Sequence, residues 1–302
     1  MTFVNRVRKN SGLYLLILPA VILSFCFAYI PMYGIIIAFK DYRNALGIVG
    51  SPWADPLFKN FIQFFNSFQF GTTIKNTLTI SFYCLAAMVP LPIMLAIMVN
   101  QMRVGFSRRF FQTVTYLPHF ISTVVIVGML LIMLSPGTGL IGNIYRLFGA
   151  AAPNLIGEAS AFAHVYVWSD IWQHTGWDSI IYLAALTTVD PVLYEAATID
   201  GASRWKRIWH IDIPMILPTV FILLILRMGN VMNVGFEKVY LMQNNLNLSA
   251  SEVISTYVYK IGIISSQYSY SAAISLFNTF VNLVLLVTVN FVSRRINKTS
   301  LW

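Results

Sequence analysis

The sequence predicts an all-α membrane protein with six transmembrane helices. Hydrophobic residues make up 57% of the 302-residue chain and charged residues only 10%, whereas soluble domains carry roughly 25% charged residues. The apolar residues gather in runs close to the length of about 20 residues that a helix needs to cross a bilayer. These runs lack the period-two alternation of membrane strands, so the pattern favours helices.

Six runs qualify, and each is expected to form one helix. The first follows basic residues, as a signal-peptide core does, but it stays apolar for about twice the length of such a core. We therefore expect an uncleaved span. The fourth run is the least apolar, and prolines inside several runs are tolerated where neighbouring helices satisfy the freed backbone groups. In chain order the runs cover residues 13–39, 77–100, 112–135, 161–187, 214–235 and 270–293.

The distribution of lysine and arginine predicts the orientation of these helices. If the chain starts in the cytoplasm, the cytoplasmic segments hold twelve of these residues and the longer outside segments hold seven. Because cytoplasmic loops carry an excess of positive charge, the N- and C-termini are both expected in the cytoplasm. The twelve are Arg6, Arg8, Lys9, Arg103, Arg108, Arg109, Arg204, Lys206, Arg207, Arg294, Arg295 and Lys298; the seven are Lys40, Arg43, Lys59, Lys75, Arg146, Lys238 and Lys260.

Sequence motifs for several other functions are missing. The chain has no G-x-x-x-x-G-K-[ST] motif for binding ATP, and no H-E-x-x-H or G-x-S-x-G motif of a hydrolase. Its four histidines show no zinc-ligand spacing, so no metal site is expected. Cys26 and Cys84 each lie inside an apolar run and are expected to be free thiols.

The most polar stretch, DPVLYEAATIDGASRWKRIWHIDI, lies between the fourth and fifth runs. Asp190 and Pro191 are typical of a helix N-cap and first helical position, and Gly201 is typical of a left-handed residue that ends a helix. A second short helix is expected from Ala202 to Ile211, stopped by Pro214.

Physical chemistry alone leaves two interpretations of this stretch. It could be an interfacial loop that places tryptophans in the lipid headgroups and basic residues on anionic lipid. That interpretation gives no role to Glu195 or Asp200, which gain nothing from an anionic surface. A protein partner with a basic groove would explain both carboxylates.

The same stretch resembles the EAA loop of permease subunits of binding-protein-dependent ABC importers. Two other stretches, LILPAVILSFCFAYIPMYGIIIAFKDY and YVYKIGIISSQYSYSAAISLFNTFVNLVLLVTVNFVSRRIN, look like the first and last spans of carbohydrate permeases. The chain is similar to the larger maltose permease subunit and to permeases for oligosaccharides or polysaccharides. The family pattern is carried here by Glu195, Ala196, Ala197, Asp200, Gly201, Ala202, Ile211 and Pro214.

The resemblance implies the type I importer fold, with residues 1–302 as one transmembrane permease domain. Its core would cover about residues 72–293 and its coupling loop about residues 190–213. In this family the loop docks on a separate ATPase, so Glu195 would pair with a basic group there, the two alanines would allow close approach, and Gly201 would set the turn. ATP and Mg²⁺ would be bound by that ATPase, so we expect no cofactor on this chain, and we do not expect the chain to be an enzyme.

The resemblance also implies partners and a location. A second EAA-type permease, two ATP-binding subunits and an extracellular solute-binding protein would complete an importer in a bacterial cytoplasmic membrane. Membrane lipid and a carbohydrate are then expected ligands, and nucleic acid is not.

Polar side chains inside the runs indicate where a substrate would bind, because such groups are costly against lipid. On the fourth helix a carboxylate, an amide, an imidazole and an indole share one face, a set suited to a sugar. We expect them to face the asparagines of the fifth run across one cavity. Alternatively, the carboxylate and imidazole only bond each other and join helices. The residues are Asp170, Gln173, His174, Trp177, Asn230 and Asn233.

Other polar residues in the spans are expected to join helices. Arg227 is expected to pair with Asp170 or Asp178, and Asn278 and Asn282 are expected to bridge helices.

Two rival functions remain open at this point. One is an ABC permease for a peptide or a lipid-linked molecule; the other is an intramembrane enzyme that uses Asp170 and Asp178 and works without partners.

Overall fold

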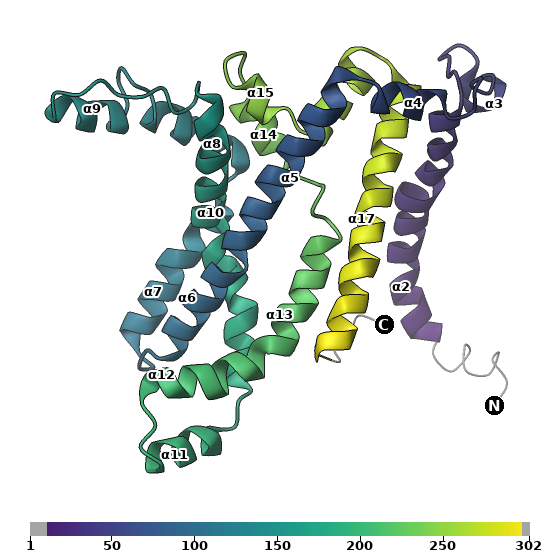
Figure 1. Cartoon of the computed structure of the whole chain (residues 1–302). Coiled ribbons are helices and arrows are strands. Elements are labelled where there is room, and N and C mark those ends of the chain that lie inside the picture. The colour runs from purple at the N-terminus through teal and green to yellow at the C-terminus, as the bar shows by residue number, and fades with distance from the viewer. Residues whose placement is uncertain (1–10, 298–302) are drawn as a thin grey trace. The chain divides into compact units, whose positions relative to one another are not determined.

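The computed structural model describes residues 11–297, which contain helices, turns and loops but no strand (Figure 1). The basic residues expected at the two ends, Arg6, Arg8, Lys9 and Lys298, lie outside the described residues. Contacts divide the chain into two units. Unit 1 is Met1–Ser67 with Val258–Phe277, and unit 2 is Phe68–Tyr257 with Asn278–Trp302.

Unit 1 begins with a long apolar helix, Ser11–Phe39. It consists of α2 (Ser11–Ser24), a π-helical turn η1 (Phe25–Tyr29) and a 3₁₀ segment η2 (Ile30–Phe39). Pro31 stands in the first turn of η2, and because proline has no backbone N–H the regular α-helical ladder is interrupted there. Nearly all side chains of this helix are exposed, as suits a helix that faces lipid.

A compact cap follows this helix in unit 1. It contains α3 (Gly47–Gly50), α4 (Lys59–Phe65), η5 (Lys260–Ile264) and the first part of α17 (Tyr268–Asn297). Lys40 is buried, and its ammonium group donates to the carbonyls of Ile48, Val49 and Ser51 at 2.7, 3.1 and 3.0 Å. The sequence prediction counted Lys40 in an outside segment, and the structure adds that its ammonium group satisfies the backbone at the end of a helix.

Unit 2 is organised around one long helix, α10, which packs against α5, α6, α7 and α13. In Figure 1, α11 and α12 lie at one end of this unit and α9, α14 and α15 at the other. In chain order its helices are α5 (Phe68–Met88), α6 (Pro90–Asn100), α7 (Phe106–Tyr116), η3 (Leu117–Phe120), α8 (Thr123–Met133), α9 (Leu140–Leu147), α10 (Ala159–Thr187), α11 (Pro191–Ile199), α12 (Arg204–Arg207), η4 (Ile208–Asp212), α13 (Ile213–Met228), α14 (Phe236–Met242), α15 (Leu248–Ser251) and α16 (Ile254–Tyr259).

Two apolar clusters bury the two halves of α10. Tyr166, Val167 and Ile171 pack with residues of α5, α8 and α14, while Tyr182 and Leu183 pack with residues of α6 and α13. The fourth run was predicted as the least apolar, and the buried side chains of α10 explain why. A helix surrounded by protein can carry polar groups that a lipid-facing helix cannot.

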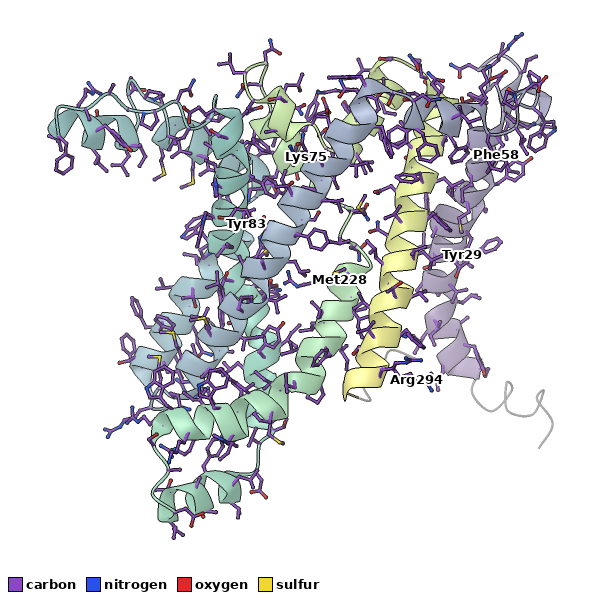
Figure 2. All side chains as sticks on the ribbon, viewed as in Figure 1. Tyr29, Phe58, Lys75, Tyr83, Met228 and Arg294 are labelled. Atoms are coloured by element: carbon purple, nitrogen blue, oxygen red, sulfur yellow. The ribbon has the colours of Figure 1, made fainter. Side chains whose placement is uncertain are left out.

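The third and fifth runs differ from the predicted continuous helices. The third bends by 96° between η3 and α8, because Ile121 and Ser122 are extended after Pro118. The fifth was expected to reach residue 235 but ends at Met228, labelled in Figure 2, and residues 229–235 contain no regular helix. The glycine and asparagine residues in that segment favour turns over helix.

Within the described residues, four helices are long and apolar enough to cross a membrane, or up to six if each of two bent pairs is one span. The four are Ser11–Phe39, Phe68–Asn100, Arg204–Met228 and Tyr268–Arg295. The bent pairs are α7–η3 with α8 and α10 with α11. The chain is therefore a multi-pass, all-helical membrane protein.

Gly176 generates a stability prediction, because a β-carbon there would collide with the backbone of Thr115 where α7 crosses α10. Gly176→Val should lower the free energy of unfolding by about 1–3 kcal/mol or more, since a backbone cannot yield as a flexible side chain can. The melting temperature of the purified protein measures this. Gly128→Val in α8 is the matched control, because its β-carbon would meet nothing within 4 Å. Equal melting temperatures for the two variants would contradict the close crossing.

Candidate functional site

The loop between α10 and α13 begins with the predicted short helix, and its ends are capped as expected. The Asp190 side chain accepts a hydrogen bond from the Val192 N–H at 2.9 Å. At the other end Gly201 has a φ of 70°, and the Ala202 N–H donates to the Ala197 carbonyl at 2.8 Å. This pair of features is a Schellman ending, which needs a residue that tolerates the left-handed conformation. The turn that Gly201 was predicted to make is confirmed.

The second half of the loop differs from the prediction. Ser203 caps α12, and the helix continues through the π-helical turn η4 into α13 without a stop. Pro214 was expected to end this helix. It instead lies at the start of α13, directly after the π-helical turn, where the regular α-helical hydrogen bonding is already interrupted.

A buried carboxylate joins this loop to the end of α6 and the start of α13 by hydrogen bonds. Asp212 is fully buried and accepts hydrogen bonds from the Tyr194 hydroxyl at 2.5 Å and from the Gln101 side chain at 3.1 Å. Burial, followed by the bond to Asp212, raises the pKa of the Tyr194 hydroxyl, which therefore stays protonated and donates at neutral pH. No role was predicted for these three residues. The only feature of the sequence that could have indicated a buried carboxylate is an aspartate between two isoleucines next to a span.

The outward side of α11 has charged and apolar groups that the chain leaves unused. Glu195 and Ala196 are exposed, and Glu195 forms no hydrogen bond or ion pair within residues 11–297. Val192 and Ile199 are 62% and 86% exposed. An exposed apolar helix face with a free carboxylate is typical of a surface that a protein partner covers.

A cavity with a volume of about 460 Å³ lies in unit 2. It is bordered by α5, α10, the end of α13 and the irregular segment 229–235. Non-helical backbone inside a membrane is tolerated where it lines a cavity, so the break in the fifth run and the cavity belong together. The polar residues on its wall are Ser81, Asp170, Arg227, Asn230 and Asn233.

Ion pairs neutralise the charges around this cavity. Lys238 is 4% exposed, and its ammonium group lies 3.1 Å from Asp170 and over the Tyr166 ring. His174 also lies 3.5 Å from the Asp170 carboxylate, which confirms the expected contact. Arg227 pairs with Asp178, which decides between its two predicted partners. Lys238 was counted in an outside segment, and no feature of the sequence indicated that it belongs to this network.

The expected single cavity face holds only part of the predicted set. Asp170, Asn230 and Asn233 line the cavity. Gln173 is buried on another side of α10 and donates to the Ile121 carbonyl at 3.0 Å, where the third run bends. Trp177 is also away from this cavity, because its ring stacks on the His119 ring with centroids 4.5 Å apart. At the bend of the third run the Ile121 carbonyl binds Gln173 and the His119 ring packs on Trp177. The positions of residues around one helix could not predict these contacts.

Asn278 and Asn282 of α17 were predicted to bridge helices, but both bond to the irregular segment 229–235. Asn282 is buried and accepts from the Met232 N–H at 3.0 Å, and Asn278 donates to the Asn233 side chain at 2.8 Å. The cysteines are free thiols. Within residues 11–297 no group of three His, Cys, Asp or Glu side chains could hold a metal ion.

Residues 88–298 match the sequence family described as "Binding-protein-dependent transport system inner membrane component". The chain belongs to this family. The "Polygalacturonan/rhamnogalacturonan transport system permease protein YteP" of Bacillus subtilis (strain 168) is 41% identical over 97% of this chain and 91% of its own length. "Protein LplB" of the same organism is 37% identical over 100% of this chain and 94% of its own length.

The fold of this permease also has a close relative among solved structures. It superimposes with a TM-score of 0.90, at 38% identity over 99% of both chains, on a chain of a bacterial alginate ABC transporter in complex with an alginate pentasaccharide-bound periplasmic protein. The permease therefore has the type I importer permease-like fold. Membership of a family of transport components also argues against the intramembrane enzyme, as do the cations paired with Asp170 and Asp178.

The Asp212 contacts of this permease generate a prediction about the loop at residues 190–213. Tyr194→Phe removes one of the two donors to a fully buried carboxylate, which should lower the free energy of unfolding by about 1–3 kcal/mol. Limited proteolysis should cut within residues 190–203 sooner than in the unmodified protein, because α11 loses its attachment. Tyr145→Phe, on an exposed helix, is the matched control. Unchanged melting and cleavage in Tyr194→Phe would show that packing alone holds α11.

Proposed function

We propose that this permease is the membrane subunit of an ATP-driven importer that moves a carbohydrate, in the form of an oligosaccharide, into the cell. The observation that carries the proposal is a single helix, α13, which begins at the capped loop with its free Glu195 and ends at the polar cavity. An importer needs a surface that contacts its ATPase and a passage for its substrate. The helix α13 connects the loop, which would be the contact, to the cavity, which would be part of the passage. The names of the relatives support a saccharide rather than a peptide or a lipid-linked molecule.

The proposal includes the arrangement of the chain in the membrane. We place six spans in one domain over residues 1–302. Both termini lie in the cytoplasm of a bacterium, and the loop at residues 190–213 lies on the same side. This arrangement agrees with the excess of lysine and arginine in those segments.

The proposed partners follow from the exposed surfaces and the absent ATP motif. A separate ATPase, in two copies, would bind ATP and Mg²⁺ and receive α11, with Glu195 opposite a basic group and Ala196 permitting close approach. A second EAA-type permease would complete the passage, because a single permease chain encloses only part of it. An extracellular solute-binding protein would deliver the cargo, as the periplasmic protein does with alginate pentasaccharide in the related structure.

Within the passage we assign substrate contacts first to Asn230, Asn233 and Asp170. Asn230 is exposed to the cavity and its amide makes only a long hydrogen bond of 3.4 Å to the Leu226 carbonyl. Its polar atoms are therefore free to bind hydroxyl groups. Gln173, His174 and Trp177 support this site from behind, through the bend of the third run and through Asp170.

The coupling role predicts the effect of reversing one charge. Glu195→Lys should abolish most of the saccharide-stimulated ATP hydrolysis and weaken copurification of the ATPase, because attraction to a basic cleft becomes repulsion. The reconstituted importer provides both measurements. Glu158→Lys makes the same charge change at an exposed position outside the loop and should leave both unchanged. Normal stimulated hydrolysis in Glu195→Lys would leave the loop as an interfacial helix.

The cavity role predicts that transport and stability separate. Asn230→Leu should reduce uptake per assembled complex by about 5- to 150-fold, the effect of losing a bond worth about 1–3 kcal/mol, with little change in melting temperature. Asn282→Leu should do the reverse, because Asn282 satisfies a buried N–H. Uptake and melting temperature are measured on the same preparations. If Asn230→Leu melts early and transports normally, its role is to join helices.

A further inference from the structure

Unit 1 contains a polar cavity that the transport site does not use. It has a volume of about 280 Å³ and lies where the chain leaves η2 and where it enters α17. Aromatic rings, amides and charged groups share its wall, the mixture of groups that orients a small polar ligand in a protein site. Its lining includes Tyr42, Tyr268, Gln63, Gln267, Arg43 and Lys59.

Buried hydrogen bonds and a strained turn hold this wall in place. The Tyr42 N–H donates to the Ser269 hydroxyl at 3.0 Å, and the rings of Tyr42 and Tyr268 meet edge to face with centroids 5.8 Å apart. Asn60, 5% exposed, donates to the Ala38 carbonyl at 2.9 Å. Ser266 has a φ of 56°, which a residue with a β-carbon rarely adopts. Strain of this kind persists where surrounding structure enforces it, and it gathers at ligand sites.

One of the charged side chains on the wall, a cation, has no partner of opposite charge among residues 11–297. Asp41 accepts from the Lys59 ammonium with both oxygens, at 2.9 and 3.1 Å, so these two groups neutralise each other. The Arg43 side chain forms no ion pair or hydrogen bond with any residue between 11 and 297. Around the transport cavity, by contrast, Asp170 and Arg227 each have a partner of opposite charge. The cavity of unit 1 is therefore the one of the two that attracts an anion.

We propose that this cavity is a second saccharide site, which binds a sugar residue carrying a carboxylate. Arg43 pairs with the carboxylate, the amides of Gln63 and Gln267 bind hydroxyl groups, and Tyr268 packs against the ring. The inference rests on the proposed function, because the predicted topology puts residues 40–67 and 258–267 outside the cell, where an oligosaccharide arrives. It adds a preference for acidic sugars at a position before the membrane passage.

A side chain from a docked solute-binding protein would be a different occupant. Such a contact needs an exposed charge, which Arg43 supplies, but it does not need a recessed wall of tyrosines and amides. A sugar ring uses every one of these groups, so the composition of the wall favours the saccharide.

The test uses the complete importer in nanodiscs and four probes: trigalacturonate, trimannuronate and the neutral methyl ester of each. Titration calorimetry is carried out on the Asn230→Leu background, which weakens binding in the transport cavity by about 5- to 150-fold. We expect at least one acid to bind more tightly than its ester. Arg43→Gln should then weaken binding of the acid by roughly tenfold, the effect of a charge-assisted hydrogen bond, and leave the ester unchanged.

Matched variants separate the site from general effects. Lys75→Gln removes a positive charge from α5 at an exposed residue that does not line the cavity (Figure 2), and it should change nothing. Tyr268→Ala should weaken acid and ester alike, whereas Tyr268→Phe, which keeps the ring, should restore binding. Melting temperatures check that each variant is folded.

Three results would overturn the inference. They are equal affinity for acid and ester, absence of binding for all four probes, and an Arg43→Gln variant that loses docking of the solute-binding protein with and without cargo while its saccharide affinity is unchanged. The third assigns Arg43 to a protein contact. Failure of the proposed function is a separate result, namely that the unmodified importer with its binding protein moves no saccharide at all.

Discussion

The buried carboxylate of Asp212 connects α11 to α13, the helix that ends at the polar cavity. It accepts from Tyr194 on α11 and from Gln101 at the end of α6, and it immediately precedes α13. An unpaired charge in such a position costs several kcal/mol, so these elements are constrained to move together. The 16 residues of α13 then extend to the break at Gly229. The Asp212 contacts and α13, which contains Pro218, therefore form one continuous connection between α11 and the cavity.

The need of buried polar groups for partners within the protein also determines the structure around the cavity. Polar groups at membrane depth are costly unless they find partners in the protein. Lys238 and His174 surround Asp170, Arg227 pairs with Asp178, and Asn282 satisfies the backbone of the irregular segment. These pairs allow the chain to leave the helical conformation between residues 229 and 235 and to present Asn230 and Asn233 to the cavity. The ion pairs thus maintain the cavity, and at its wall Asn230 makes only one long hydrogen bond, to the Leu226 carbonyl.

The two cavities differ in a way that bears on selectivity. In unit 2 the charges are matched, so a passage of that kind is indifferent to the charge of a sugar and sensitive to its hydroxyl groups. In unit 1 the ion pair of Asp41 with Lys59 leaves Arg43 unmatched. A saccharide transporter with both features would select for an acidic sugar before the passage and would move it without a strong charge trap inside.

The sequence by itself determined the class of protein and its local signals. The hydropathy of the runs predicted the membrane helices, and the pattern Glu195-Ala196-Ala197 with Asp200-Gly201 identified the loop, because its caps and left-handed glycine depend on neighbours within a few residues. Tertiary structure alone decided that Arg227 pairs with Asp178, that Lys40 and Lys238 are buried, and that Gln173 turns to the bend of the third run. It also decided that the fifth helix stops at Met228. These outcomes depend on which helices surround a residue, and a helical-wheel argument describes one helix at a time.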